Sequence, residues 1–141
     1  MTAPIRALAL VCSLKPNPAS SSTELLASQV LEQLSTYGIE CSSLRVVDYD
    51  VRPGVEADMG SGDQWPSILD RIREADILLL ATPTWVGHMS SVAQRVLERL
   101  DAALSETDES GRPSMVGKVA VTAVVGNEDG AHKSPRIYSR P

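Results

Sequence analysis

The sequence of 141 residues contains no phenylalanine, and two tryptophans and three tyrosines are its only aromatic residues. The core is therefore expected to be aliphatic, built from Ala, Val, Leu and Ile. Apolar residues make up 43% of the chain and charged residues 22%. This is near the usual balance of globular proteins and excludes a fibrous or wholly disordered chain. The length fits a single domain of about 100–200 residues.

The chain also lacks an excess of positive charge. Its 13 Lys and Arg residues are outnumbered by 18 Asp and Glu residues, so the formal net charge is −5. Proteins that bind nucleic acids or anionic membranes present clustered basic residues, because both partners carry dense negative charge. We therefore expect no nucleic-acid partner and no membrane partner.

No long hydrophobic run is present. The longest apolar stretch, residues 77–81 (ILLLA), is far shorter than the roughly 20 residues that a membrane-spanning helix needs. The first residues superficially resemble a secretion signal. However, Val11 precedes Cys12 where such a signal has a small residue, and Arg6 alone supplies positive charge there. We expect a cytoplasmic protein.

Cysteine is scarce, with Cys12 and Cys41 the only two in the chain. The strands predicted below place them at opposite ends of adjacent parallel strands, on the order of 20 Å apart. That separation is too large for a disulfide bond. Two reduced cysteines are consistent with the cytoplasm.

Apolar runs alternate with helical periodicity along the chain. Four runs predict strands, and the first lacks polar alternation, as expected for a strand buried on both faces: residues 5–11, 39–47, 76–82 and 118–125. Apolar residues at helical spacing between these runs predict three helices: one marked by Leu26 to Tyr37, a short one over residues 67–74 (entered near Gln64) and one marked by Val92 to Leu104. This order predicts a parallel α/β sheet with helices on both faces.

Capping signals mark the ends of these helices. Ser21 and Glu24 have the spacing of a capping box, and Gly38 fits the left-handed position past the end of the first helix. Ser90 or Ser91 is expected to cap the third helix. The predicted core faces are Leu26, Val30, Leu34 and Tyr37 in the first helix, and Val92, Val96, Leu100 and Leu104 in the third.

The last nine residues, 133–141 (KSPRIYSRP), contain three basic residues, no acidic residue and no regular periodicity. We expect a domain over residues 1–132 followed by an irregular basic tail. The fourth strand would then form an exposed apolar edge, which favours aggregation. We therefore expect that a fifth strand and a last helix are missing through truncation or a changed reading frame near Lys133, or that another subunit completes the sheet.

Ligands of open parallel α/β sheets bind at the carboxyl ends of the strands. Three predicted loops lie there: residues 12–23, 82–91 and 126–132. The first, CSLKPNPASSST, combines hydroxyl groups with the free N–H groups of a helix N-terminus, which suits a phosphate dianion. Ordinary helix capping by a serine-rich loop is the alternative.

The second loop, TPTWVGHMSS, contains an aromatic side chain near a glycine. Trp85 is suited to stacking on a planar ring, and Gly87 permits a ligand to approach the backbone. Alternatively, Trp85 is a half-buried packing residue. The third loop, GNEDGAH, is a turn that can close over the other side of a ligand.

Several other chemistries lack their residues. The chain has no GxxxxGK[ST], GxGxxG or GxSxG motif. A cysteine phosphatase would have an arginine six residues after Cys12, where Pro18 stands, and a phospho-receiver would have an aspartate where Ala81 and Thr82 end the third strand. With His88 and His132 as the only histidines and no clustered cysteines, no metal site is expected.

Together, CSLKPNPASSSTELL and TPTWVGHMSSVAQRVLERLD resemble the flavodoxin-fold NAD(P)H-dependent FMN reductase family, which includes the WrbA-type quinone reductases. The resemblance covers residues 5 to 132. It implies a flavodoxin-like, doubly wound parallel sheet with strand order 2-1-3-4(-5), in which the last strand and helix are missing here. Family members often form dimers or tetramers, so the resemblance also implies a homo-oligomer.

The resemblance implies an FMN site made by three segments. The first loop would bind the phosphate through Ser13, Lys15, Ser21, Ser22 and Thr23, with Lys15 where an arginine is common in the family. The isoalloxazine ring would lie along Pro83, Thr84, Trp85, Val86 and Gly87. The loop after the fourth strand would approach the flavin or the substrate through Gly126, Asn127 and the residues up to His132.

The implied activity is hydride transfer from NAD(P)H through FMN to a quinone, a flavin or a similar small-molecule acceptor. The protein would position the cofactor and stabilise charge on it, so no catalytic side chain is expected. A single cleft used in turn by NAD(P)H and the acceptor would give ping-pong kinetics. The alternatives are a flavodoxin-like single-electron carrier without NAD(P)H activity and an inactive truncated fragment.

Overall fold

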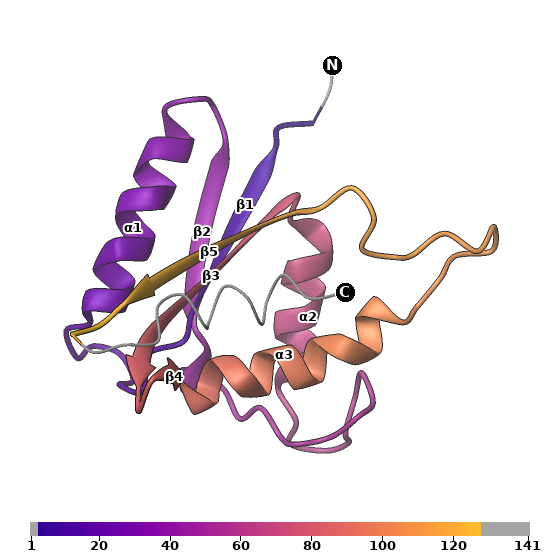
Figure 1. Cartoon of the computed structure of the whole chain (residues 1–141). Coiled ribbons are helices and arrows are strands. Elements are labelled where there is room, and N and C mark those ends of the chain that lie inside the picture. Colours follow the sequence, from indigo (N-terminus) through magenta and orange to yellow (C-terminus); the bar gives the residue numbers. More distant parts are fainter. Residues whose placement is uncertain (1–2, 128–141) are drawn as a thin grey trace.

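Four parallel strands form a sheet at the centre of the molecule (Figure 1). The computed structural model describes residues 3–127. The strands lie in the order β2-β1-β3-β5, and their bounds are Arg6–Val11 (β1), Glu40–Arg45 (β2), Ile77–Trp85 (β3) and Val119–Val125 (β5). A two-residue strand, β4 (His88–Met89), precedes β5 in the chain. The order of the four parallel strands is therefore the predicted order 2-1-3-4.

The helices cover both faces of this sheet, which confirms the doubly wound arrangement. Helix α1 (Ser22–Ser35) lies on one face, and α2 (Trp65–Glu74) and α3 (Ser91–Leu104) lie on the other (Figure 1). The expected caps are present, because the hydroxyls of Ser21 and Ser90 accept hydrogen bonds from the first turns of α1 and α3. A single 3-10 turn, η1 (Val46–Asp48), follows β2, so this strand ends two residues earlier than predicted.

The two faces of the sheet differ in the size of their side chains. Toward α2 and α3, the strands present mainly leucines, which pack against Trp65 and Ile68: Leu8, Leu10, Leu44, Leu78 and Leu80. Toward α1, most of the buried strand residues are alanines: Ala7, Ala9, Ala81 and Ala123. We call this second face the alanine floor. The core is aliphatic as predicted, apart from the fully buried Trp65.

The buried face of α1 is rotated from the predicted one. Its fully buried residues are Thr23, Ala27 and Leu31. The predicted Leu26, Val30 and Leu34 lie beside this line and are partly buried, and Tyr37 is 81% exposed. The short side chain of Ala27 explains the rotation, because it allows the helix to lie close to the alanine floor. In α3, Leu104 is likewise exposed, and Arg99 occupies a buried position on the core face.

Strand β3 ends three residues later than predicted, which corrects the placement of the second loop. Pro83, Thr84 and Trp85 lie in the strand because Thr84 and Trp85 pair with β4 in an antiparallel hairpin. Only Val86 and Gly87 remain in the turn, both at positive φ (51° and 70°). Two-residue hairpin turns with both residues left-handed match the twist of the strands, and they favour Asn-Gly. The Val-Gly pair gave no such sequence signal.

Val86 is strained in this turn, because a β-branched side chain is disfavoured at positive φ. We expect Val86→Asn to raise the free energy of unfolding by about 1 kcal/mol, since asparagine tolerates the left-handed conformation. Chemical denaturation measures this change. Val116→Asn is the control: Val116 is also exposed and has no positive φ, so its replacement should change stability by less than about 0.5 kcal/mol. A Val86→Asn variant no more stable than the wild type would contradict the strain.

A buried arginine anchors the long connection between η1 and α2. The guanidinium of Arg99 forms two hydrogen bonds to the carboxylate of Asp63, at 3.0 and 2.7 Å, and neither side chain is exposed. The same guanidinium donates to the carbonyl oxygens of Arg52 and Glu56 and lies over the ring of Trp65. The hydrogen bonds from Arg99 are the main cause that holds the pKa of Asp63 well below its usual range. The connection is thus tied to the core face of α3.

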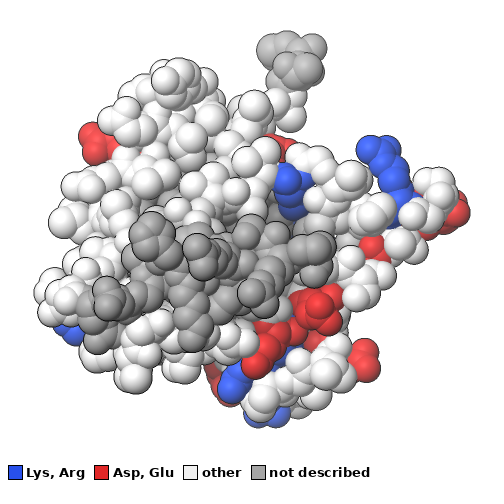
Figure 2. All heavy atoms as spheres, in the orientation of Figure 1, with Lys and Arg blue, Asp and Glu red and all other residues white. Residues whose placement is uncertain are grey.

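The cysteines lie where the predicted strands place them, and the visible surface carries charges of both signs. Among the described side chains visible in Figure 2, Lys and Arg form no continuous patch. Cys12 and Cys41 are free, and the register places Cys41 beside Ala7, at the opposite end of β1 from Cys12. Within residues 3–127, no helix has the length and apolar character needed to cross a membrane. The predicted tail, residues 133–141, lies outside the described residues.

Candidate functional site

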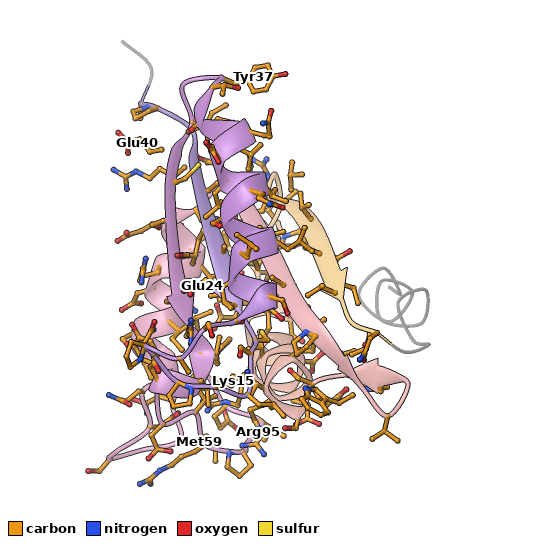
Figure 3. All side chains as sticks on the ribbon, turned by 90° about the vertical axis from the view of Figure 1, so that its left-hand side faces the viewer. Lys15, Glu24, Tyr37, Glu40, Met59 and Arg95 are labelled. Atoms are coloured by element: carbon orange, nitrogen blue, oxygen red, sulfur yellow. The ribbon has the colours of Figure 1, made fainter. Side chains whose placement is uncertain are left out.

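The predicted ligand segments meet at the carboxyl edge of the sheet. Figure 3 shows Lys15 and Arg95 at this end of the molecule, whereas Tyr37 and Glu40 lie at the opposite end. The parallel register pairs Val11 at the end of β1 with Ala81 in β3, and Pro83 with Val125 at the end of β5. The segments that follow these residues therefore leave the sheet side by side.

The N-terminus of α1 offers the polar groups expected of a phosphate site. Ser21 caps the helix, and its hydroxyl accepts from the backbone N–H of Glu24 at 3.1 Å. Ser22 and Thr23 are the first two helical residues, so their N–H groups have no partner within the helix. The Ser22 side chain is exposed and Thr23 is buried. Two free N–H groups, an exposed hydroxyl and the helix dipole favour an anion here.

The remaining two phosphate candidates have different surroundings. Ser13 is buried, and its hydroxyl accepts from the backbone N–H of Lys15 at 3.1 Å, so it shapes the turn after β1. Lys15 is exposed, and within the described part of the chain its ammonium group forms no ion pair. Lys15 is therefore available to contact a ligand, whereas Ser13 mainly supports the loop.

Arg45, which was not predicted from the sequence, forms hydrogen bonds to the backbone of this loop. Its side chain is 2% exposed, and its Nη1 donates to the carbonyl oxygens of Lys15 and Pro16, both at 3.1 Å. Nearby, the carboxylate of Asp48 accepts from the backbone N–H of Asn17 at 3.0 Å and from its side-chain amide. These hydrogen bonds lower the pKa of Asp48. The only sequence signal for Arg45 was that it is the single charged residue in the stretch 41–47.

The predicted capping box is only half formed. Ser21 accepts from Glu24 as expected, but the Glu24 carboxylate accepts from Nη2 of Arg45. This charged partner competes with the N–H of Ser21, and a charge-assisted hydrogen bond is the stronger of the two. The pKa of Arg45 is raised, mainly by this hydrogen bond. Glu24 thus links the first turn of α1 to β2.

Ser90 ties the first two segments together. Its hydroxyl donates to the carbonyl oxygen of Cys12 at 2.7 Å and accepts from the N–H of Ala93 at 3.1 Å. Its own N–H donates to the hydroxyl of Thr82 at 3.0 Å. Both Ser90 and Thr82 are fully buried. The N-terminal cap of α3 therefore also links the loop after β1, by hydrogen bonds, to the hairpin formed by β3 and β4.

Thr84 and Gly126 bring the second and third segments into contact. A Cβ atom on Gly126 would lie 1.7 Å from Oγ1 and 2.9 Å from Cβ of Thr84, so no side chain fits at Gly126 without displacement. Thr84 is 7% exposed, and its buried hydroxyl has no hydrogen-bond partner within residues 3–127. A buried polar group without a partner is costly, and such groups often mark a ligand site. Thr84 is therefore the clearest single indication of a ligand at this edge.

The tip of the hairpin is exposed and apolar. Trp85 is 52% exposed and Val86 is 93% exposed. Trp85 is thus neither a core residue nor fully in solvent, which leaves one face of its ring open to a planar ligand. Asn127 and Gly126 are also exposed at this edge. His132 lies outside the described residues.

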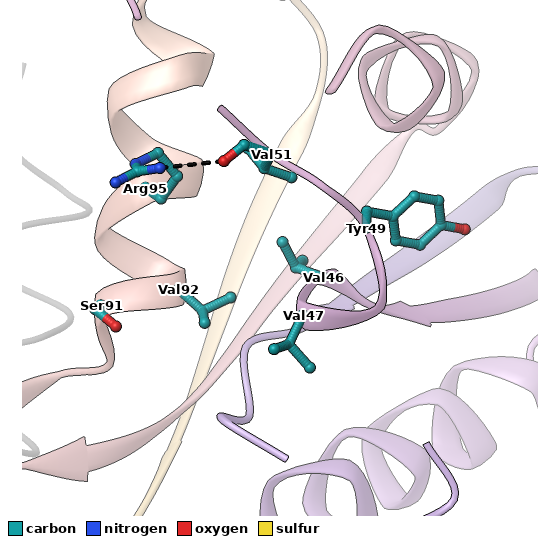
Figure 4. A pocket seen from close by; sticks show the side chains of 7 residues that line it. All are labelled: Val46, Val47, Tyr49, Val51, Ser91, Val92 and Arg95. Atoms are coloured by element: carbon teal, nitrogen blue, oxygen red, sulfur yellow. Dashed lines mark hydrogen bonds between the residues drawn. The ribbon is translucent and has the colours of Figure 1, made fainter. Parts of the chain in front are cut away.

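A small cavity opens next to the N-terminus of α3 (Figure 4). Its volume is about 210 Å³. The lining comes from η1, the following connection and α3: Val46, Val47, Tyr49, Val51, Ser91, Val92 and Arg95. Nη1 of Arg95 donates to the carbonyl oxygen of Val51 at 3.1 Å and closes one side. The cavity is smaller than the ~300 Å³ that ligand pockets usually reach, so it does not enclose a flavin by itself.

Thiol and metal chemistry find no support at this edge. Burial raises the pKa of Cys12 to about 12, and its thiol donates to the carbonyl oxygen of Leu10. A thiol in this state is not a nucleophile at neutral pH. No group of three or more His, Cys, Asp or Glu side chains suited to a metal ion occurs within residues 3–127.

These residues fit an FMN molecule at the edge. The start of α1, with Lys15, suits the phosphate. The unpaired hydroxyl of Thr84 suits a ring with hydrogen-bonding atoms, and the half-exposed Trp85 supplies an aromatic side chain. The arrangement offers binding and positioning groups, and the absence of a catalytic side chain stays a prediction.

The chain is similar to known proteins in sequence and in fold. A family model described as NADPH-dependent FMN reductase matches residues 5–135. The 8-demethyl-8-aminoriboflavin-5′-phosphate synthase of Streptomyces davaonensis is 34% identical over 137 residues, which are 91% of this chain and 53% of that protein. The divalent metal cation transporter MntH of Mycobacterium bovis is 37% identical over 130 residues, 89% of this chain and 19% of the transporter.

A solved structure is similar to this chain in both fold and sequence. The crystal structure of RosB with the bound intermediate 8-demethyl-8-formylriboflavin-5′-phosphate has a TM-score of 0.85 and 31% identity, and the match covers 95% of this chain and 57% of that one. The chain thus spans about half the length of RosB and of the synthase. With the family model matching more than half of its residues, the chain belongs to the NADPH-dependent FMN reductase family.

Proposed function

We propose that the chain binds FMN and contributes to hydride transfer from NAD(P)H to a small-molecule acceptor such as a quinone or a free flavin. The observation that carries this proposal is the buried hydroxyl of Thr84, which lies against Gly126 and has no hydrogen-bond partner within residues 3–127. The hydrogen bonds of Ser90 connect this point to the loop that leads to α1. Membership of the family supports the same ligand.

In this proposal each segment has a separate task. Ser22, Thr23 and Lys15 hold the phosphate, while Ser13 and Ser21 keep the loop in shape. Pro83 to Gly87 and Gly126 with Asn127 line the ring. When bound, the flavin supplies the redox chemistry, accepting hydride from a nicotinamide and passing electrons onward. The chain's part is to orient the ring and to place backbone dipoles near it.

An FMN titration tests the proposal, with riboflavin as the control that lacks only the phosphate. Flavin fluorescence reports binding of each. We expect FMN to bind at least about tenfold more tightly than riboflavin, because charge-assisted hydrogen bonds to the phosphate are lost with riboflavin. NAD(P)H oxidation in the presence of a quinone then tests turnover. Equal binding of the two flavins, or none by the folded chain, would contradict the proposed phosphate site.

Lys15→Gln should weaken FMN binding about three- to tenfold, since an exposed ammonium group contributes on the order of 1 kcal/mol to a charged contact. Riboflavin affinity should not change. The loss should shrink at high salt, because exposed charges are screened. Lys118→Gln is a matched control, since Lys118 lies at the other end of the sheet, where its Nζ donates to the carbonyl oxygen of Arg73. A Lys15→Gln variant that binds both flavins like the wild type would remove Lys15 from the site.

A second candidate treats a flavin phosphate as the substrate. The name of the synthase and the flavin phosphate intermediate bound to RosB, both proteins more than 30% identical to this chain, favour it. Mass spectrometry of the flavin after incubation with NAD(P)H and a quinone distinguishes the two. An unchanged mass after many turnovers supports a cofactor role, and a changed mass supports the second candidate. NAD(P)H oxidation itself separates both from a single-electron carrier.

The cytoplasmic location and the homo-oligomeric state expected from the sequence belong to this proposal too. The exposed Trp85 and Val86 are consistent with a site that another subunit covers. Analytical ultracentrifugation of the chain with and without FMN tests self-association. A chain that remains a monomer in both would contradict it.

A further inference from the structure

We propose that Arg45 is a positioning residue that sets the preference of this site for a phosphorylated flavin over an unphosphorylated one. This inference rests on the proposed function, because it concerns the loop to which we assign the phosphate. Arg45 acts through the loop and through Glu24, with no contact to the ligand itself.

The guanidinium is committed to protein groups. Its Nη1 donates to the carbonyl oxygens of Lys15 and Pro16, and its Nη2 donates to the Glu24 carboxylate. Its Nε is buried without a partner among residues 3–127. At 2% exposure, the side chain has no surface to offer a ligand. Any effect of Arg45 on binding must therefore pass through the groups that it holds.

The first of these groups are two backbone carbonyls. A carbonyl oxygen carries partial negative charge, and a phosphate dianion is repelled by such oxygens at close range. Arg45 directs the oxygens of Lys15 and Pro16 toward itself, beneath the loop. Meanwhile Lys15, whose carbonyl is held, keeps its side chain exposed. The loop thus presents its cation outward and two of its negative dipole ends inward.

The second group is the carboxylate of Glu24. Glu24 lies in the first turn of α1, the same turn that presents the N–H groups of Ser22 and Thr23. An unpaired carboxylate there would repel a phosphate at the helix N-terminus. The ion pair with Arg45 neutralises this charge and draws the carboxylate toward β2. Riboflavin carries no phosphate, so its binding is insensitive to both effects.

Asp48 supports the same loop from the same short segment. Its two carboxylate oxygens accept from the backbone and side-chain N–H groups of Asn17. Arg45 and Asp48 are three residues apart, at the end of β2 and in η1, and they hold consecutive residues of the loop. Hydrogen bonds from the end of β2 and from η1 therefore hold the loop after β1, although neither element borders the proposed ring site.

The test compares FMN and riboflavin affinities across a set of variants. Arg45→Met should weaken FMN binding about tenfold, the effect of losing a charge-assisted contact, while riboflavin affinity changes less than about twofold. Adding Glu24→Gln to Arg45→Met should recover part of the loss, because the unpaired carboxylate is then removed. Arg45→Lys should be intermediate, since one ammonium group cannot reach all three acceptors.

Arg99→Lys is the matched control. Arg99 is an equally buried arginine that also holds carbonyl oxygens, but in the connection before α2. It should lower stability and leave the ratio of FMN to riboflavin affinity unchanged. If Arg45→Met does not fold, Asp48→Ala gives the test through an exposed residue, with about a threefold loss for FMN alone and Asp50→Ala as its control.

The outcomes separate the inference from the proposed function. A wild-type chain that does not prefer FMN over riboflavin overturns the phosphate site and this inference with it. A wild-type preference that persists in Arg45→Met and Asp48→Ala overturns the inference alone. Equal losses for FMN and riboflavin would show a merely structural role and would overturn it as well.

Discussion

Asp63→Asn should lower the free energy of unfolding by about 3–5 kcal/mol at pH 7, the usual cost of removing one member of a buried ion pair. Neither Asp63 nor Arg99 has exposed side-chain surface, so the guanidinium would keep its charge without a carboxylate to balance it. Asp63 also accepts from the N–H groups of Met59 and Trp65, and these contacts would weaken too. Urea denaturation followed by circular dichroism measures the change.

The pH dependence identifies the carboxylate as the cause. The pKa of Asp63 is lowered, chiefly by hydrogen bonds from Arg99, so the folded state holds its proton less tightly than the unfolded state. Its contribution to stability is complete above the unfolded pKa of about 4 and is lost as the pH falls below that value. The stability difference between the wild type and Asp63→Asn should therefore shrink below about pH 4.

Asp50→Asn is the control for Asp63→Asn. Asp50 pairs with Arg52 at 3.8 Å, but its side chain is 63% exposed, so the change should cost less than about 1 kcal/mol. Similar losses in the two variants, or a loss at Asp63 that does not depend on pH in the acid range, would contradict the anchoring role of the buried pair.

Gly126→Ala should have the largest effect on FMN binding of any single methyl group added to the chain. The new Cβ would overlap Oγ1 of Thr84 and approach its Cβ to 2.9 Å and its backbone nitrogen to 3.3 Å. Rotation of the threonine relieves only the first contact, so the end of β5 must move away from β3. Overpacking of this kind lowers the free energy of unfolding by about 1–3 kcal/mol. FMN affinity should fall as well, by about tenfold, because the displaced backbone borders the proposed ring site.

A second substitution tests whether the contact with Thr84 is responsible. In a Thr84→Ala background the closest overlap is absent, so adding Gly126→Ala should cost less than it does in the wild type. This double-mutant cycle isolates the coupling between the two residues. Calorimetric titration with riboflavin gives the ring contribution without the phosphate. Unchanged riboflavin affinity in Gly126→Ala would mean that the ring does not lie against the end of β5.

Much of the fold follows from patterns that act locally. Apolar runs predicted β1, β3 and β5, because a strand buried on both faces needs no polar alternation. The more polar β2 was predicted from its place between two helical segments. Serines before the helical segments predicted the caps at Ser21 and Ser90. The family resemblance brought the loop after β1, the end of β3 and Gly126 together, and the structure places these described segments at one edge of the sheet.

The features that sequence reasoning missed depend on contacts between distant residues. Arg45 reaches Lys15 across 30 positions, and Arg99 reaches Asp63 across 36. Neither pairing leaves a trace in local periodicity. A weak signal did exist for Arg99, since it lies three residues after Val96 on the core face of α3, and a charge at such a position needs a buried partner. The hairpin of β3 and β4 was missed because Val-Gly is a poor turn sequence.

Because of the alanine floor, the two faces of the sheet are sensitive to opposite kinds of substitution. On the leucine side, trimming a side chain leaves a void beneath α2 or α3, and enlarging one is the smaller risk. At the four alanines under α1 there is little to trim, and a larger side chain there would push the helix away from the sheet. Because these alanines are short, the strand backbone fixes the distance between α1 and the sheet. The first turn of α1, which is proposed to bind the phosphate, is therefore held at a fixed distance from the sheet.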